Sequence, residues 1–465
     1  MSTLRRVAPL TRLAAGLPWI VATLVAFALF QWFAPGWFTF DTAHQWWMAR
    51  TGQLDSTHPA VMVRLWQASR VLLPDPQGFF ALQLGLIWGG LAFVATALPL
   101  RTPWRIAVLL GIGLWPAFVA LQPQVWKDLW MVGALLWAVG ALLREQAAPA
   151  WRWRGLALLM LALATAFRFN AITGVLPLWA WLAWRMARVP VGLKGAPPED
   201  GAPSPVTRTR LAVALLSLPL LLGLAALPDR LGTVRHVTVW PIIALWDLAA
   251  VSIETGRMAI PAPFLKPGAT VDDLAREFDP AVNVPSFITG TIRFHYELTV
   301  PAEDLARLRD AWLMLPLRDP QAWTRHRLRL SAYLFGLRNA ELADTQVLMP
   351  DLIPFQDNPP LVMAPSRPRE VLVAAWHRWV DGPFFMGGLY VLLAGGVLLA
   401  AAWRRRAAAT ALSASGLAMV APLVPLATAA DFRYLLWLVV ASLLALALLL
   451  VPAAQTGAAT PPRAA

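Results

Sequence analysis

The chain has 465 residues, of which 58% are hydrophobic and only 14% are charged. Soluble domains carry about 25% charged residues, so this is the composition of a membrane protein. The absence of cysteine excludes disulfide scaffolds, thiolate metal sites and cysteine nucleophiles. The six histidines show no paired spacing typical of zinc ligands. The sequence also lacks the phosphate-binding P-loop motif, so nothing indicates a nucleotide-driven pump.

Apolar runs separated by polar loops predict an all-α polytopic membrane protein with about ten transmembrane helices. Most runs approach the ~20 residues that cross the hydrocarbon. Two of them, 155–168 and 171–187, are short enough for a hairpin that crosses only in part or for two tilted spans. The predicted spans are 17–34, 78–100, 104–121, 128–143, 155–168, 171–187, 211–228, 384–403, 408–428 and 434–452.

The formal net charge of +13 is interpreted from where Lys and Arg lie relative to these spans. Basic residues concentrate in the loops on one side, and the positive-inside rule makes that side cytoplasmic. Both termini are then cytoplasmic, and the charge indicates topology rather than nucleic-acid binding. The first run has no A-x-A-like cleavage site behind it, so we interpret it as an uncleaved anchor.

The predicted organisation alternates membrane and polar parts. The segment between the seventh and eighth spans is long enough for a domain of its own. We expect it to be extracytoplasmic, mainly helical and inserted before the last three spans. The parts are an N-terminal transmembrane module at 1–228 with a first outer loop at 35–77, a flexible Pro/Gly-rich linker at 188–210, the extracytoplasmic segment at 229–383, C-terminal helices at 384–452 and a disordered cytoplasmic tail at 453–465.

Within the extracytoplasmic segment, apolar spacing predicts a helix over Ala302–Leu315. Asp319-Pro320 predicts the start of a second helix that runs to about Leu337. The second helix carries Arg325, Arg327 and Arg329 beside aromatic residues. It either lies on the membrane surface or the bundle, or helps to bind an anionic head group. A short strand pair is expected at 287–296.

Ionisable residues at membrane depth are costly and therefore indicate function; here nearly all of them lie at the predicted outer surface. In the first outer loop, Asp41 is expected as the N-cap of a helix that ends near Thr51. Asp41, His44, Gln45 and Met48 have the spacing of one helix face. Asp41 either only caps this helix or accepts a proton from a substrate hydroxyl, and His44 either faces lipid head groups or contacts the substrate.

Two further motifs place polar residues at outer helix starts. His58-Pro59 predicts a helix with Pro at its first position, and His58 is either its plain N-terminal residue or a substrate contact. Val125-Trp126-Lys127-Asp128 opens the fourth span. A lysine at a helix N-terminus opposes the helix dipole, so Lys127 needs a partner, either Asp128 or an anionic ligand.

Two arginine motifs complete the outer set. Arg168 lies between apolar neighbours at the tip of the short pair and is either an interface snorkel or a phosphate contact, because a guanidinium donates two parallel hydrogen bonds to phosphate. Arg433 is either paired with Asp431 or available to a ligand. The candidate substrate-binding residues are His44, Gln45, His58, Lys127, Asp128, Arg168, Asn170, Asp431, Arg433 and Tyr434, with Asp41 as the candidate catalytic residue and no assigned metal ligand.

The order of these motifs resembles the GT-C superfamily of membrane glycosyltransferases, such as the protein O-mannosyltransferase and lipid A aminoarabinose transferase groups. The leading Asp and later His-Pro of the first loop, the Trp-Lys-Asp run, the Arg-x-Asn and the late Asp-x-Arg-Tyr carry the resemblance, which covers about 1–190 and 384–452. It implies that Asp41 is the base that activates the acceptor, and that Lys127, Arg168 and Arg433 contact a lipid phosphate.

The implied reaction moves a sugar, with inversion, from a polyprenyl-phosphate donor to a cell-envelope glycan, lipid or protein acceptor. It takes place at the outer face of the bacterial inner membrane; the abundance of Arg, Ala, Leu and Pro is typical of a high-GC bacterium. Many members carry paired acids in the first loop. Here Thr42 follows Asp41 and the next acid is Asp55. One carboxylate is a poor divalent-cation site, so a divalent metal is left open.

Three other classes fit part of the pattern. A ligase or polymerase that uses lipid-linked oligosaccharides would share the anionic-lipid site but not the first-loop aspartate. A transporter or flippase would need charged or broken helices near the bilayer midplane and paired halves, whereas the predicted span centres carry almost no charge. An assembly protein would use 229–383 as an interaction surface. The transferase hypothesis predicts that Asp41, Lys127, Arg168 and Arg433 meet at one outer site.

Overall fold

The computed structural model describes residues 4–189, 191, 208–283, 290–294, 300–338 and 347–451. The described residues form helices. Their only β-structure consists of isolated bridges, without an extended strand. The all-α class is therefore confirmed for this part of the chain. Most of the predicted linker, half of the predicted strand pair and the predicted tail lie outside the described residues. In the described half of the strand pair, Ile292 forms an antiparallel bridge with Leu265.

Five helical stretches are long and apolar enough to cross a membrane, as expected for a membrane protein. Their side chains toward the outside are large and apolar, for example Leu24 and Phe27 of α1 and Leu216 of α10. The stretches lie in α1 (Leu4–Phe33), α4 (Gln77–Ala97), α10 (Arg208–Arg230), α19 (Ala407–Val420) with α20 (Leu423–Leu426), and η6 (Phe432–Leu435) with α21 (Leu436–Leu450).

The other predicted spans form helices that are shorter or carry charges, so the count of ten spans stays a prediction. The expected span at 104–121 is interrupted at Trp115-Pro116, because proline disfavours helical conformation in the preceding residue. The short pair forms two helices that meet at Arg168. These elements are α5 (Thr102–Gly113), α6 (Pro116–Val119), α7 (Lys127–Ala147), α8 (Trp151–Phe167), α9 (Ile172–Arg188) and α18 (Gly387–Trp403).

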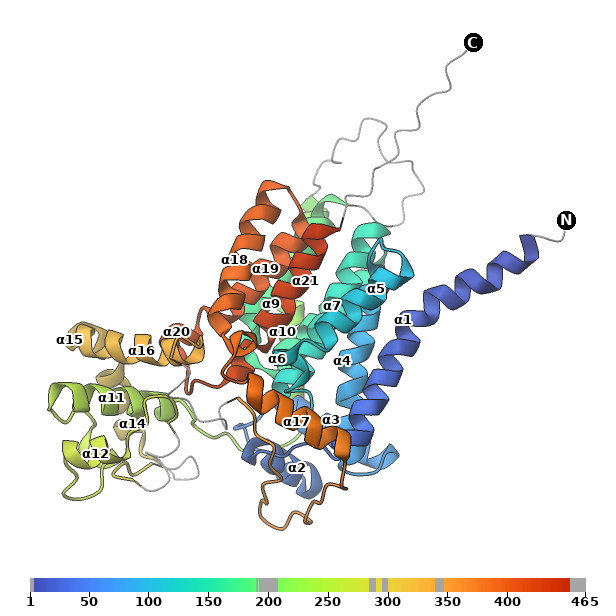
Figure 1. Cartoon of the computed structure of the whole chain (residues 1–465). Helices are drawn as coiled ribbons and strands as arrows, with labels where there is room; N and C mark the ends of the chain where they lie inside the picture. Colours follow the sequence, from blue (N-terminus) through green and yellow to red (C-terminus); the bar gives the residue numbers. More distant parts are fainter. Residues whose placement is uncertain are drawn as a thin grey trace.

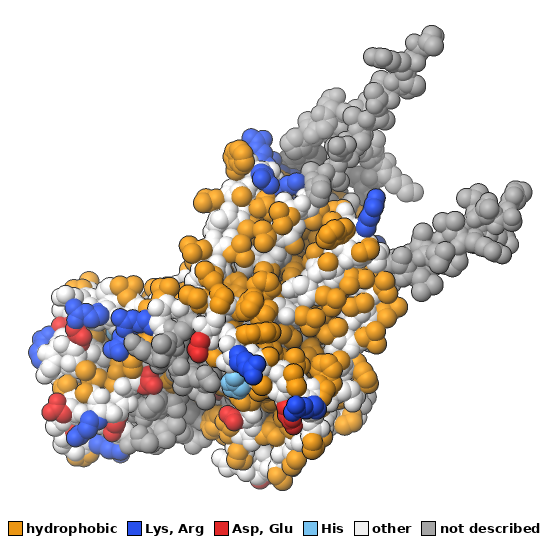
Figure 2. All heavy atoms as spheres, in the orientation of Figure 1, with side chains coloured by type: hydrophobic (Ala, Val, Ile, Leu, Met, Phe, Trp, Pro, Cys, Tyr) orange, Lys and Arg blue, Asp and Glu red, His pale blue; other side chains and the backbone are white. Residues whose placement is uncertain are grey.

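These helices run side by side as one bundle (Figure 1). α2 (Phe40–Thr51) and α3 (Ala60–Leu72) lie at one end of the bundle, which we call the loop end. α1 begins and α21 ends at the opposite end of the bundle. Figure 2 shows a broad hydrophobic surface over the bundle, with acidic and basic side chains gathered on the part that projects from its loop end. This division matches a bundle surrounded by lipid and a projection in water.

The projecting part, the lobe (residues 240–338), has a core of its own. Leu245, Leu248, Leu274, Leu308 and Leu315 are among its buried residues. The helix expected at 302–315 is present as α14 and α15, and the helix expected after Asp319 begins there and ends at Leu334. The lobe helices are α11 (Pro241–Thr255), α12 (Val271–Glu277), α14 (Ala302–Leu313), α15 (Leu315–Arg318) and α16 (Pro320–Leu334).

A buried ionic network joins the lobe to the bundle. Arg327 of α16 is only 2% exposed. Its guanidinium donates to Asp247 Oδ2 at 2.5 Å and to the carbonyl of Ala427, after α20, at 2.7 Å. The Trp312 indole also donates to Asp247 Oδ2, at 2.7 Å. Arg327 therefore faces neither lipid nor water.

After the lobe, the chain returns to the bundle. Residues 347–366, the return segment, lie against the first loop, where Leu352 pairs with Phe38 through a parallel bridge. α17 (Arg367–Trp379) follows and stacks Trp376 on Phe33, with ring centroids 5.5 Å apart. Residues 229–383 therefore contribute to the lobe core and to the bundle core.

Close packing of α4 on α7 depends on glycine. A Cβ atom at Gly140 would lie 2.4 Å from Cδ1 of Phe93. Phe93 cannot move aside easily, because it stacks on Trp137 at 4.7 Å and lies 3.6 Å from the Arg144 guanidinium. Small residues allow such close approach between membrane helices.

We expect Gly140→Ala to lower the free energy of unfolding by about 2 kcal/mol, the usual cost of overpacking a core. Gly155→Ala in α8 is the matched control, because no neighbouring atom lies within 4 Å of its Cβ position. Thermal unfolding in detergent measures both variants. An unchanged midpoint for Gly140→Ala would contradict the packing described.

Candidate functional site at the loop end

The first loop is fastened to the segment that precedes α7. The Trp37 amide donates to the Pro123 carbonyl at 2.8 Å, and the Val125 amide donates to the Trp37 carbonyl at 3.2 Å. The Thr42 hydroxyl donates to the Val125 carbonyl at 2.9 Å. These contacts bring the start of α2 and the start of α7 to the same place.

The expectation that Asp41 is the N-cap of α2 is wrong, because Thr39 takes that position. Thr39 is extended, and its hydroxyl accepts a hydrogen bond from the Trp126 indole at 3.0 Å. Asp41 is therefore the second residue of the helix, and its carboxylate is not used as a cap. The next helix, α3, has Pro59 as its N-cap rather than as its first residue.

Buried glutamines hold the segment before Lys127. The Gln83 side chain of α4 donates to the Gln124 carbonyl at 2.7 Å, and the Trp88 indole donates to the Gln122 side chain at 2.9 Å. Gln122 in turn donates to the Gly113 carbonyl at 2.9 Å. This support was not predicted from the sequence, although two glutamines around Pro123 in an apolar context were a signal for buried polar contacts.

Arg433 connects two acids from distant parts of the chain. Its Nη1 lies 3.2 Å from Asp41 Oδ2, and its Nε lies 2.7 Å from Asp431 Oδ2. The guanidinium also lies 4.9 Å from the centre of the Trp126 ring. The Asp41 side chain remains 32% exposed. The Asp431–Arg433 pair is thus present, and the same arginine also holds Asp41.

The pKa of Asp41 is held well below its ordinary value. Burial by itself would raise this pKa, but the positive charges of Arg433 and Lys127 outweigh burial. Asp41 is therefore an anion throughout the physiological pH range. It is also a weak proton acceptor for as long as those charges remain uncompensated by another anion.

Arg168 pairs with Asp128, which is fully buried at the start of α7. Its guanidinium lies 4.6 Å from the Tyr434 ring, and its Nε donates to Asn170 Oδ1 at 2.9 Å. The side chain is only 15% exposed, so Arg168 does not snorkel to the interface. Asp128 serves Arg168 and not Lys127.

Lys127 is a half-buried cation beside Asp41, Arg168 and Arg433, whose charges act on it. Within the described ranges, Lys127 has no salt-bridge partner. Lys127, Arg168, Arg433, Asp41, Asp128 and Asp431 form what we call the boundary cluster. It contains three carboxylates and three cations, so its formal charge is balanced before any ligand binds.

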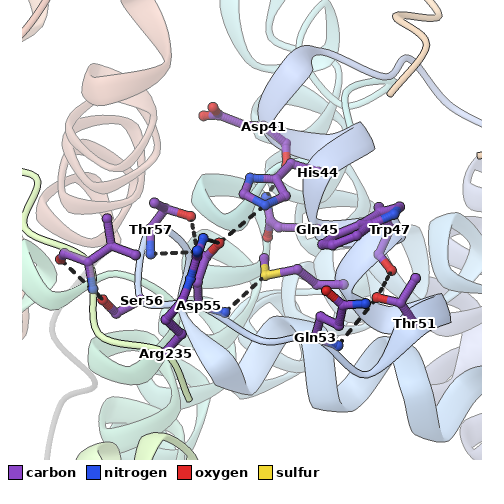
Figure 3. A network of polar contacts seen from close by, with 12 residues as sticks. Asp41, His44, Gln45, Trp47, Thr51, Gln53, Asp55, Ser56, Thr57 and Arg235 are labelled. Atoms are coloured by element: carbon purple, nitrogen blue, oxygen red, sulfur yellow. Dashed lines mark hydrogen bonds and ion pairs between the residues drawn. The ribbon is translucent and has the colours of Figure 1, made fainter. Parts of the chain in front are cut away.

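His44 belongs to a second group of polar contacts (Figure 3). Its Nε2 lies 3.4 Å from Asp55 Oδ2, and its ring stacks on Phe355 of the return segment, with centroids 4.7 Å apart. In Figure 3 the Asp41 carboxylate points away from the His44 ring. Because His44 is buried, it does not face lipid head groups.

Asp55 is the centre of this second group. It accepts hydrogen bonds from the backbone and side chain of Thr57 and lies 3.7 Å from Arg235 Nη2. Burial would raise the pKa of Asp55, but the hydrogen bonds from His44 and Thr57 outweigh burial and hold the pKa well below its ordinary value. This group stabilises the first loop.

His58 and Gln45 offer unused acceptor atoms near Asp41. His58 is buried, its ring is 5.1 Å from that of His44, and its Nδ1 has no hydrogen-bond partner among the described residues. Burial and the charge of Lys127 lower the pKa of His58 to about 3, so the imidazole is neutral. Gln45 donates to the Asp41 carbonyl at 2.9 Å, and its Oε1 is buried without a partner.

A separate ionic group lies at the opposite end of the bundle. Arg154 donates to Glu145 Oε1 at 3.0 and 2.9 Å, and Arg185 pairs with the same carboxylate. Glu145 is fully buried. From the sequence these residues were expected only as loop charges, but they join α7, α8 and α9.

The described residues contain no group of three or more His, Asp or Glu side chains placed to hold a metal ion. Comparison of the chain with protein-family models, curated proteins and solved structures gives no match. The function is therefore inferred from the residues of the boundary cluster.

We expect Asp55→Asn to lower the free energy of unfolding at pH 7 by about 2 kcal/mol, since a charged acceptor of hydrogen bonds is lost. The depressed pKa means that the wild type keeps this stabilisation above the ordinary aspartate value of about 4 and loses it as pH falls below that value. Thermal unfolding from neutral to acidic pH should show the two proteins converging. A constant difference would contradict the role given to Asp55.

Proposed function

We propose that this protein is a membrane glycosyltransferase that moves a sugar from a polyprenyl-phosphate donor to an acceptor at the loop end of the bundle. One observation carries the proposal: the partly exposed Asp41 lies beside Arg433 and Lys127 where apolar helices end. An acid suits activation of an acceptor hydroxyl. Cations at the boundary of the hydrocarbon suit the phosphate of a lipid whose chain stays in the bilayer.

Lys127 and Arg433 are the proposed phosphate contacts. Lys127 has no salt-bridge partner in the described part of the chain, so its ammonium group can donate to an anion, and Arg433 is shared between two carboxylates. Both would stabilise the negative charge that develops on the leaving polyprenyl phosphate. Arg168 is committed to the buried Asp128, so its proposed contribution is to the positive potential and to the position of α7.

The proposed reaction is a single in-line displacement. The acceptor O–H bond breaks and its proton goes to the Asp41 carboxylate. The acceptor oxygen bonds to the anomeric carbon as the bond from that carbon to the phosphate oxygen breaks. The products are the inverted glycoside and the polyprenyl phosphate. Nδ1 of His58 and Oε1 of Gln45 are proposed to accept hydrogen bonds from substrate hydroxyls, because both atoms are buried without partners.

Charge balance supports this role for Asp41. The boundary cluster is neutral as it stands, and a phosphodiester adds one negative charge. That charge would offset part of the field of Arg433 and Lys127, which holds the pKa of Asp41 down. The pKa of Asp41 would then rise, so the carboxylate is the strongest base when the donor is present.

The proposed setting is the inner membrane of a bacterium, with ten spans, both termini cytoplasmic and the boundary cluster outside. The loop arginines support this orientation. A transporter would need polar groups along the length of the bundle. In the bundle, α7 instead has its ionisable residues at its two ends, and α21 has none along its length. The ligase alternative shares the phosphate contacts but gives no role to Asp41.

Asp41→Asn should reduce turnover by roughly 10³-fold, within the usual range for loss of a general base, with the fold kept. Purified protein in lipid is assayed with a panel of polyprenyl-phosphate sugars. Asp357→Asn is the control, because that side chain is 70% exposed and should behave as the wild type. Equal turnover in the Asp41 variant and the wild type would exclude Asp41 as the base.

Lys127→Ala should raise the apparent KM for the donor roughly tenfold, the effect of losing one charge-assisted hydrogen bond. Stability should change little, because Lys127 lacks a salt-bridge partner among the described residues. Arg168→Ala should instead lower the unfolding temperature, since it leaves Asp128 buried without its partner. Lys266→Ala, on the exposed lobe surface, is the control. An unchanged donor KM in Lys127→Ala would remove the phosphate assignment.

A further inference from the structure

The outward face of α15 and α16 combines arginines with large apolar side chains. Leu317 and Leu328 are 74% and 58% exposed, and Arg325 and Arg329 lie beside Leu328 on the same side of α16. A groove of about 920 Å³ runs along α16 between Pro320 and Arg338. This face, which we call the arginine–leucine face, belongs to neither core.

The opposite face of α16 is already occupied. Leu330 and Leu334 are buried in the bundle core, Ala322 is buried in the lobe core, and Arg327 is fixed by Asp247 and Ala427. The helix is therefore held in one orientation by its buried side. The arginine–leucine face has no other protein surface against it among the described residues.

Positive charge exceeds negative charge on this face. Among the described residues around the groove, Arg325 is paired with Glu254 of α11. Asp319 accepts instead from Arg257, at 2.6 Å. No carboxylate among the described residues contacts Arg329 or Arg338. Exposed leucines among uncompensated arginines are the composition of a helix that lies in a membrane interface.

The position of α16 sets this face near the edge of the bilayer. The helix ends against the beginning of α18, where the Gly388 amide donates to the Phe335 carbonyl at 2.8 Å. From there α18 continues with the lipid-facing Leu389, Leu392 and Leu399. In Figure 1, α15 and α16 form the upper edge of the lobe, on the side toward which the bundle extends, and α12 lies at the lower edge.

We infer that the arginine–leucine face rests on the membrane, with its leucines in the interface and its arginines on the phosphates of anionic phospholipids. The lobe is thereby held against the same bilayer that surrounds the bundle. This inference does not depend on the proposed sugar transfer, because it uses only the lobe and its attachment. The partner is the lipid surface and not a second protein.

The test uses full-length protein in lipid nanodiscs. Because the chain has no cysteine, Leu328→Cys carries a single polarity-sensitive fluorophore. Ala275→Cys on α12, which is exposed at the far edge of the lobe, is the matched control. Quenching by lipids that carry a spin label is measured in discs of phosphatidylcholine alone and in discs that also contain phosphatidylglycerol.

The expected result is lipid quenching at position 328 and none at position 275, with quenching at 328 increased by phosphatidylglycerol. Arg329→Gln in the labelled protein should weaken the apparent anionic-lipid dependence roughly fivefold, since each arginine near an anionic surface contributes about that factor. Arg276→Gln on α12 should leave it unchanged.

Three outcomes would overturn the inference. The first is equal, water-like behaviour at positions 328 and 275. The second is quenching at 328 that is identical in neutral and anionic discs. The third is protection of position 328 from water only in discs that hold two protein copies, which would assign the face to a second copy of the chain.

Discussion

The ion pair between Asp41 and Arg433 links residues that are 392 positions apart and brings three helix starts to one end of the bundle. Charges at the edge of an apolar medium are costly unless they are compensated. Here compensation requires the first loop, the start of α7 and the start of α21 to meet. The boundary cluster is the result of that requirement, and the proposed chemistry depends on its charge balance.

The two ends of the bundle satisfy this requirement in different ways. Glu145 is fully buried between Arg154 and Arg185, so that group is closed and suits a structural role. At the loop end, the Asp41 side chain is partly exposed and Lys127 lacks a salt bridge within the described part of the chain. A site that is neutral, reachable and incompletely paired can exchange an internal contact for a ligand contact. This difference makes the loop end the better candidate for binding an anion.

Sequence patterns predicted which residues would gather, because charged side chains in an apolar chain have few acceptable places. Asp41, Lys127, Arg168 and Arg433 were expected at one level, and the structure brings them together. The ion pairs between distant parts of the chain could not be predicted. Asp128 is adjacent to Lys127 in sequence but is buried beside Arg168, and pairing of that kind depends on tertiary geometry.

Local rules also failed where a tertiary contact replaced them. Asp41 is a good capping residue, yet Thr39 is the N-cap of α2, where the Trp126 indole holds its hydroxyl. Arginine usually lies at the surface, but Arg327 is buried, and Asp247 and the Ala427 carbonyl accept its hydrogen bonds. The break before Pro116 could have been predicted from the sequence, because the proline effect is local. Long-range partners account for the other differences.

The most direct measurement is a structure of the full chain in a lipid nanodisc with a polyprenyl-phosphate sugar bound. We expect the phosphate between Lys127 and Arg433, the lipid chain along the apolar helices, and the anomeric carbon within reach of the Asp41 carboxylate. A donor phosphate bound away from Lys127 and Arg433, or along the interior of the bundle, would contradict the proposed function.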